Sequence, residues 1–224
     1  MNVLQSKISF NELRNANDFK KLTDKEFELL SENVTLRSYK KGQTLFDEGD
    51  CRTKFYYVLE GLVRIERFDE SATYFYYDYV TNNSIFPLGG IFQSKDYLHG
   101  AQALTNILTF CIPVDLFEKI CHQNTEQLIY LIHKLDSIFQ FHQQRIQVGL
   151  TANAHDRVKQ NLYILKEELG IMDDNKEHVK IPYPITLKEL ATNSGTTRET
   201  AGLVVKNLQK NGSIEYKNKL FTFL

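Results

Sequence analysis

Residues 33 to 113 place the strongest limit on what this chain can fold into. They form short runs rich in β-branched and aromatic residues, such as KFYYVLE and LVRIERF. Turn signals such as KKG, DEGD, DES and TNN separate these runs at short intervals. Because no helical period lies between the strands, the pattern predicts a β-sandwich or β-barrel.

Helical patterns flank this strand zone on both sides. Before it, Thr23 and Glu26 form a T-x-x-E capping box, which predicts a short helix. After it, the apolar spacing changes near Val114, and residues 125–150 predict one long helix. Such a helix has about 25 residues and spans about 37 Å at 1.5 Å per residue. We expect it to project between two domains, because it is longer than one domain of this size usually covers.

The long helix carries an apolar repeat at 3-4 spacing, which is typical of the seam of a two-stranded coiled coil. We expect this seam to pair with its twin in a homodimer, and Ile129, Ile132 and Phe139 to face the strand domain. Burial of the helix within one chain is the alternative. The predicted dimer interface consists of Leu128, Leu131, Leu135, Ile138, His142 and Arg145.

The C-terminal segment predicts a winged helix-turn-helix. Thr186 with Glu189 forms a capping box that starts one helix, and Thr196 with Glu199 forms another that starts the next. Gly195 between them can adopt the positive φ angle of a sharp turn. IEYKNKLFTF then predicts a two-stranded hairpin. Two helices joined by a glycine turn and followed by a hairpin are the pattern of this motif.

The second of these helices predicts a DNA-reading surface. Its first turn can enter a major groove, where Arg198 can pair with guanine O6 and N7 and Glu199 can accept from cytosine N4. Lys206, Lys217 and Lys219 would contact phosphates, which adds affinity without sequence preference. The alternative is a surface helix in which Glu199 only caps and Arg198 is a solvated charge.

The residues T-R-E-T-A-G at 197–202, followed by apolar residues and a short wing, resemble the recognition helix of the cAMP receptor protein/FNR (Crp/Fnr) family of bacterial transcription regulators. KKGQTLFDEGD followed by FYYVLEGLVRI resembles that family's cyclic-nucleotide-binding-like barrel. The resemblance runs from about residue 20 to 224. It implies an α+β fold with a double-stranded β-helix or jelly-roll effector domain at 1–113, a dimerisation segment at 114–150 and a winged helix-turn-helix at 151–224.

The resemblance also implies roles for single residues. Arg198 and Glu199 match the family's base-reading pair. Thr186 and Thr197 match positions that contact phosphate, and we also expect Thr196 to contact phosphate. The partners implied are double-stranded DNA, a second copy of the chain and RNA polymerase.

One reading position departs from the family. The cAMP receptor protein has a second reading arginine four residues after the glutamate, and this chain has Leu203 there. Leucine cannot bond guanine, but it can pack on a thymine methyl group. We therefore expect a TGTGA-like palindrome with an altered preference at one base pair per half-site.

The nucleotide cassette of the barrel is degenerate. In members that bind cyclic nucleotides, a Gly-Glu pair holds the ribose and an Arg-Ser or Arg-Thr pair holds the phosphate. The corresponding stretch, NSIFPLGGIFQSKDYLHGAQAL, has no Glu after its glycines and no Arg before AQAL. A phosphate would enter unpaired at a high cost, so we expect no cAMP regulation. The candidate pocket for another effector consists of Phe86, Leu88, Gly89, Gly90 and His99.

The other cofactors of the family lack their ligands in this sequence. An iron–sulfur cluster needs a group of cysteines, but Cys51, Cys111 and Cys121 are scattered. A haem sensor would need a Cys/His pair, and His99 has no neighbouring cysteine. We expect neither group and no metal. Thiol chemistry at one cysteine, an unidentified small molecule and no effector at all stay open.

Composition limits the remaining classes. The chain is 42% hydrophobic and 25% charged with a net charge of −1, which is typical of a soluble globular protein. It has no apolar run of membrane-spanning length and no signal-peptide pattern at its N-terminus, so we expect a cytoplasmic protein. A cupin-like enzyme is the alternative class, but His99 is the only histidine of the strand zone. A metal-dependent cupin site is therefore hard to build, and we expect no enzyme.

Overall fold

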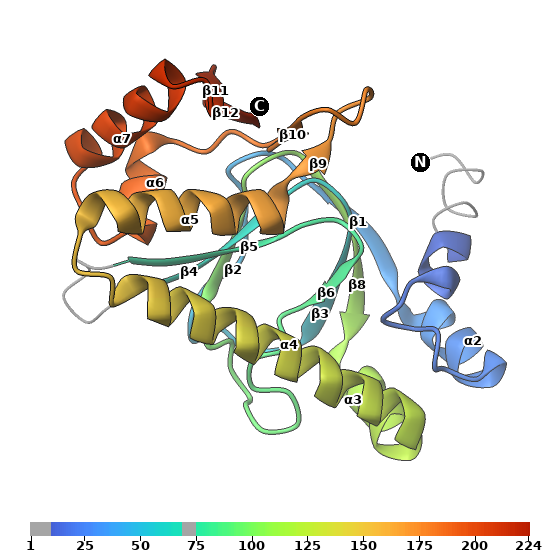
Figure 1. The fold of residues 1–224 in the computed structure, drawn as a ribbon. Coiled ribbons are helices and arrows are strands. Elements are labelled where there is room, and N and C mark those ends of the chain that lie inside the picture. Colours follow the sequence, from blue (N-terminus) through green and yellow to red (C-terminus); the bar gives the residue numbers. More distant parts are fainter. Residues whose placement is uncertain (1–9, 69–74) are drawn as a thin grey trace. The chain divides into compact units, whose positions relative to one another are not determined.

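The computed structural model describes residues 10–68 and 75–224. The first nine residues of the N-terminal stretch that has no signal-peptide pattern lie outside the described residues, as does the DES turn. The chain divides into two compact units (Figure 1): the described residues up to Arg67 with Asp78–Ile138, and those of Phe68–Tyr77 with Phe139–Leu224. The boundary falls inside the long helix, and our division at residues 113 and 150 stays a prediction.

The first unit contains the predicted strand domain, whose strands form two four-stranded sheets. Their orders are β1-β8-β3-β6 and β2-β7-β4-β5, and the pairs with a described register are antiparallel. The predicted α+β fold class is confirmed. The elements are α2 (Asp24–Asn33), β1 (Thr35–Tyr39), β2 (Thr44–Phe46), β3 (Lys54–Glu60), β4 (Val63–Phe68), β5 (Phe75–Val80), β6 (Ser84–Phe86), β7 (Gly100–Ala103), β8 (Ile107–Pro113), α3 (Val114–Gln123) and α4 (Thr125–Gly149).

Strand β3 is buried on both faces, which explains why its sequence does not alternate between polar and apolar residues. Phe55 and Tyr57 belong to a core cluster shared with α2, α3 and the first part of α4. Tyr56 and Val58 belong to a second cluster, formed by residues of both sheets. A strand covered by helices on one side and by a sheet on the other is apolar throughout.

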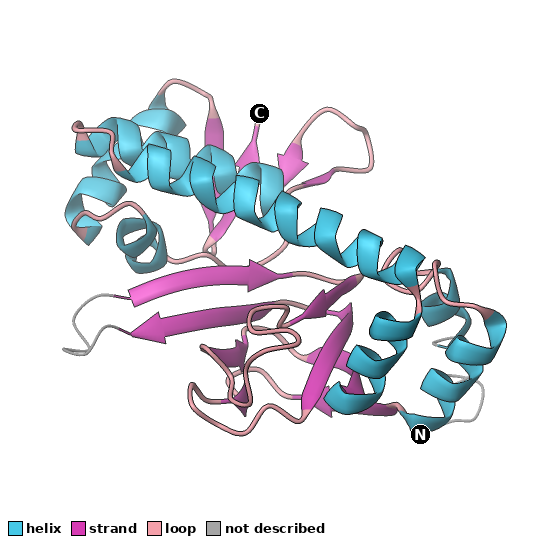
Figure 2. Cartoon of the chain, turned by 90° about the horizontal axis from the view of Figure 1, so that it is seen from below, coloured by secondary structure: helices cyan, strands magenta, loops and turns pink. Residues whose placement is uncertain are grey.

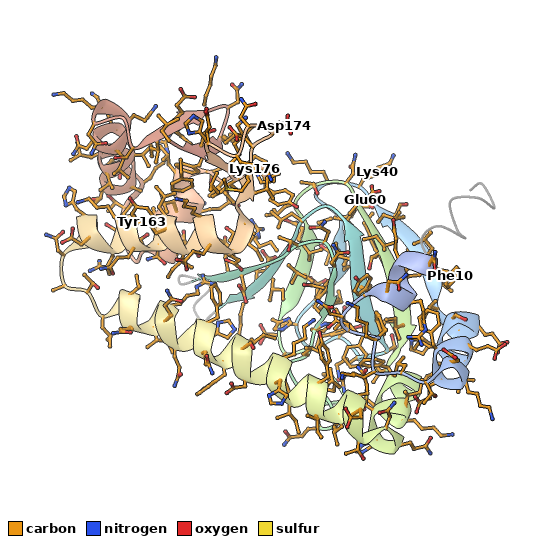
Figure 3. All side chains as sticks on the ribbon, turned by 45° about the vertical axis from the view of Figure 1, so that its right-hand side comes forward. Phe10, Lys40, Glu60, Tyr163, Asp174 and Lys176 are labelled. Atoms are coloured by element: carbon orange, nitrogen blue, oxygen red, sulfur yellow. The ribbon has the colours of Figure 1, made fainter. Side chains whose placement is uncertain are left out.

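The second unit contains the predicted winged helix-turn-helix. Its strands form one sheet in the order β11-β12-β10-β9. Figure 2 distinguishes the helices of the chain, in cyan, from its strands, in magenta. Tyr163 of α5, labelled in Figure 3, lies beside Phe223 of β12 with ring centroids 6.1 Å apart. No helix in the described parts of the chain is long and apolar enough to cross a membrane. The elements are α5 (Ala154–Leu169), β9 (Ile171–Met172), β10 (Val179–Lys180), α6 (Leu187–Asn193), α7 (Arg198–Lys210), β11 (Ile214–Lys217) and β12 (Leu220–Phe223).

Asp18 ties three parts of the first unit together, although it is only 1% exposed. Its carboxylate accepts hydrogen bonds from the N–H of Ile85 on β6 (3.0 Å) and from the hydroxyl of Tyr130 on α4 (2.9 Å). The ammonium of Lys134, one turn further along α4, forms an ion pair with the same carboxylate. The backbone carbonyl of Asp18 accepts from Nε2 of Gln127 (2.8 Å). The start of α4 is therefore bonded to the strand domain through one buried charge.

Asp18→Ala should lower the free energy of unfolding by about 3–5 kcal/mol, because it leaves a partly buried ammonium and a buried N–H unpaired. Asp24→Ala is the matched control, since Asp24 pairs with Arg14 at 2.9 Å but has a side chain that is 96% exposed. It should cost no more than about 1 kcal/mol. Urea unfolding measures both, and equal losses in the two variants would contradict the network.

Candidate nucleic-acid interface

Helix α6 begins at the predicted capping box, which is complete. Oγ1 of Thr186 accepts from the N–H of Glu189 (3.1 Å), and the Glu189 carboxylate accepts from the N–H (2.8 Å) and the hydroxyl (2.7 Å) of Thr186. Ser194 is the C-cap of the helix. Gly195 follows with a φ angle of +54°, which confirms the predicted glycine turn.

Helix α7 begins at a different cap from the one predicted. Its N-cap is Thr197, whose hydroxyl accepts from the N–H of Thr200 (3.2 Å). Thr196 belongs to the turn, where its N–H donates to the carbonyl of Ala191 (3.0 Å). The predicted box between Thr196 and Glu199 is therefore wrong. Two consecutive threonines offer two cap registers, and the length of the turn decides between them.

The tip of α7 is exposed and charged. Arg198 and Glu199 occupy its first turn, and both are exposed. The carboxylate of Glu199 accepts from its own N–H and from the hydroxyl of Thr197, which hold the pKa of Glu199 below its ordinary value. Glu199 is thus an ionised acceptor at neutral pH. Leu203, one turn later, is 50% exposed. The buried face of α7 consists of Ala201, Val204, Val205 and Leu208.

The wing is a tight hairpin with a lysine in a strained position. Lys217 pairs with Leu220 across β11 and β12, so Asn218 and Lys219 alone make the turn. Both have left-handed φ angles, +53° and +66°. Asparagine tolerates this conformation, but a residue such as lysine loses about 1–2 kcal/mol in it. Lys217 and Lys219 are both exposed.

The space between the two sheets of the first unit is filled by aromatic rings. Phe46 stacks on Tyr97 with centroids 3.7 Å apart and on Tyr56 at 5.5 Å. Tyr56 stacks in turn on Phe86 at 5.5 Å. The hydroxyl of Tyr97 donates to the carbonyl of Lys54 (2.9 Å), which fixes the ring inside. The interior is therefore a packed aromatic core.

The predicted effector pocket does not come together as one site. Phe86 lies in the cluster between the sheets, whereas Leu88 packs into the cluster under the helices. Leu88 therefore does not share a site with Phe86, and its assignment to the pocket is wrong. A Cβ at Gly89 would lie 3.7 Å from Nε2 of His99. Gly90 has a φ angle of +77°, in the left-handed region that favours glycine.

His99 is the polar member of that set. Its Nδ1 is buried with no hydrogen-bond partner among the described residues. Burial lowers the pKa of His99. The histidine therefore favours its neutral form in the folded chain.

The exposed apolar face of α4 is not the predicted one. Leu131 is only 1% exposed and Leu135 packs against the same core cluster. Arg145 donates to the carbonyl of Tyr77 (2.7 Å). Leu131 is buried within its own chain, so assigning it to a dimer interface is wrong, whereas the assignments of Leu135 and Arg145 stay predictions. Leu128 and His142 are half-buried and Ile138 is exposed, and their assignment stays a prediction.

The exposed stripe is displaced from the predicted seam by one residue. Its centre, Phe139, is 60% exposed, although we expected it to face the strand domain. The predicted seam and the exposed stripe both consist of apolar residues at 3-4 spacing. The repeat alone therefore does not show which of the two is buried within the chain. The exposed members are Ile129, Ile132, Phe139, Ile146 and Leu150.

Comparison with known proteins decides the family. Residues 36–124 match the model of the cyclic nucleotide-binding domain. The HTH-type transcriptional regulator ArcR of Staphylococcus epidermidis is 30% identical over 185 residues, which cover 82% of this chain and 78% of that protein. The chain belongs to the Crp/Fnr family of transcription regulators. ArcR of Staphylococcus haemolyticus is 28% identical over 175 residues, or 78% of this chain and 76% of that protein.

Solved structures share the fold of this Crp/Fnr chain at low sequence identity. FixK2 of Bradyrhizobium japonicum has a TM-score of 0.73 at 15% identity and covers 85% of this chain and 92% of its own. CLP of Xanthomonas campestris, described as a c-di-GMP responsive global regulator, has a TM-score of 0.71 at 19% identity and covers 90% of this chain and 99% of its own.

The three cysteines of this Crp/Fnr protein lie in different surroundings. Cys51 is exposed, whereas Cys111 and Cys121 are buried. Burial raises the pKa of the Cys121 thiol to about 12 and also raises that of Cys111. The two buried thiols are therefore protonated and unreactive at neutral pH.

Sequence reasoning missed Arg157, in the first turn of α5. Its guanidinium donates to four backbone carbonyls, in two segments of the second unit. A single arginine in an amphipathic helix carries no signal for such a role. Its partners lie up to 38 residues away in sequence.

Proposed function

We propose that this Crp/Fnr protein regulates transcription by binding a TGTGA-like palindrome as a homodimer, with α7 in the major groove. Arg198 would bond guanine O6 and N7, Glu199 would accept from cytosine N4, and Leu203 would pack on a thymine methyl group. The exposed Arg198–Glu199 pair at the tip of α7 carries the proposal. Phosphate contacts would come from Thr186, Thr196, Thr197, Lys206, Lys217 and Lys219.

Arg198→Ala should weaken binding to the palindrome by about 1–3 kcal/mol, because a bidentate contact to guanine is lost. Binding to a scrambled duplex should change far less. Lys210→Ala, at the exposed C-terminal end of the same helix, is the control and should keep the preference for the palindrome. Fluorescence anisotropy on a site selected from random DNA measures both. An Arg198→Ala variant that discriminates as well as the wild type would contradict this reading surface.

Three observations support a regulator that does not respond to cAMP. The rings of Phe46, Tyr56 and Tyr97 occupy the space between the sheets. The one arginine among the buried residues described is Arg52, and its guanidinium donates to Glu118 (2.6 Å) and to the carbonyl of Ser94 (3.0 Å). The cassette itself has no arginine. A cyclic phosphate would therefore meet a packed apolar interior without a cationic partner.

Adding cAMP should leave the affinity for the selected palindrome unchanged, because aromatic rings pack between the two sheets and the cassette has no arginine to pair with the phosphate. Isothermal titration of the DNA-free protein with cAMP should likewise give no binding heat. A gain in DNA affinity of about tenfold, equivalent to 1.4 kcal/mol of coupling, would overturn this part of the proposal.

The exposed stripe of α4 is the interface that we propose for the homodimer. Ile132, Phe139 and Ile146 repeat at seven-residue spacing, and all three side chains are exposed. Apolar residues at this spacing pair helices in a coiled coil.

Membership of the Crp/Fnr family is our reason for expecting RNA polymerase as a partner and the cytoplasm as the compartment.

Phe139→Glu should weaken dimerisation by at least about a hundredfold. A twofold interface loses each side chain twice, and burial of one phenylalanine contributes about 1.5–3 kcal/mol. Gln144→Glu introduces the same charge on another exposed part of α4 and should leave the dimer intact. Sedimentation velocity distinguishes them, and equal dissociation constants for the two variants would argue against this stripe.

A further inference from the structure

Arg157 joins two backbone segments of the second unit. Its Nη1 donates to the carbonyls of Thr151 (2.7 Å) and Ala152 (3.1 Å), just after the long helix ends. Its Nε donates to the carbonyl of Ser194 (2.9 Å) and its Nη2 to that of Gly195 (3.0 Å), in the turn between α6 and α7. Each nitrogen of one guanidinium is thus used, and all partners are main-chain atoms.

We propose that Arg157 is a positioning residue for DNA reading, which sets the orientation of the α6–α7 pair relative to the end of α4. It contacts no base itself in this scheme, which rests on the proposed reading of DNA by α7. Because a dimer must place two recognition helices in successive major grooves, both α7 tips need fixed orientations. The bonds of Arg157 supply that fixation at the junction.

The chemistry of the site requires arginine rather than any cation. The carbonyls of Ser194 and Gly195 lie at the C-terminal end of α6, where the helix dipole favours positive charge. The carbonyls of Thr151 and Ala152 approach from another direction, so only a planar fork with several N–H groups reaches both sets at once. The ammonium of a lysine could satisfy one segment and would release the other.

The junction is otherwise organised by its own caps. The side chain of Asn153 accepts from the N–H groups of His155 (2.8 Å) and Asp156 (3.4 Å) and so starts α5. The hydroxyl of Ser194 donates to the carbonyl of Leu190 (2.7 Å) within α6. These bonds stabilise each segment separately. The four bonds of Arg157 connect the two segments.

The test is Arg157→Lys, with Lys159→Arg on the same helix as control. Affinity is measured for the selected palindrome and for a scrambled duplex of equal length, beside Arg198→Ala. Arg157→Lys should bind the palindrome at least about tenfold more weakly than the wild type does, while its affinity for scrambled DNA stays within about twofold of the wild-type value. Phosphate contacts do not require a fixed orientation of the α6–α7 pair, whereas base contacts do. Lys159→Arg should match the wild type on both duplexes.

Two outcomes would overturn the inference while leaving the proposed function intact. In the first, Arg157→Lys binds both duplexes as tightly as the wild type, although Arg198→Ala has lost its preference for the palindrome. In the second, the affinities of Arg157→Lys for the palindrome and for scrambled DNA fall by the same factor, as a purely structural role predicts. If the wild type itself shows no preference, or Arg198→Ala retains it, the proposed function fails and the role of Arg157 fails with it.

Hydrogen exchange of the wild-type protein gives a second measurement, which decides the matter even if Arg157→Lys does not fold. Binding of the palindrome should slow exchange in peptides that cover the turn between α6 and α7, residues 194–197, and also in those that cover residues 150–156. Scrambled DNA should leave the second set unchanged. Protection confined to the turn would contradict a connection through Arg157.

Discussion

Strand β3 can carry a continuous row of apolar side chains only if something covers each of its faces. The second sheet covers one face through Tyr56 and Val58, and helices cover the other through Phe55 and Tyr57. This requirement places α2, α3 and the start of α4 against the same sheet. It also leaves a core of aromatic rings between the two sheets. The buried carboxylate of Asp18 then bonds α4 in place.

Features that depend on sequence neighbours could be predicted from the sequence. The structure contains the strand zone, the capping boxes at Thr23 and Thr186 and the glycine turn at Gly195. Each of these features depends on residues that are close to one another in the sequence. The exposed face of α4 could not be predicted. Two registers of its apolar repeat are equally good helices, and the choice between them depends on a sheet distant in sequence.

The candidate site divides in the same way. The pattern around Arg198 and Glu199 is local, so their exposure at the start of a helix could be expected. The sequence predicts the N-cap of α7 one residue too early, at Thr196 in place of Thr197. Either threonine can cap a helix, and the length of the preceding turn decides which one does. Arg157 was missed altogether, since all the partners that matter are main-chain carbonyls. Every residue has a main-chain carbonyl, so residue types do not show which carbonyls will accept a hydrogen bond from an arginine.

The backbone of Lys219 carries a further implication. A glycine at this turn position would relieve the left-handed strain, so selection for folding alone would remove the lysine over time. The chain therefore has an exposed cation at the tip of the wing at the expense of a weaker hairpin. Under the proposed function this cation contacts DNA phosphate, and without that contact glycine would be the more stable residue at this position.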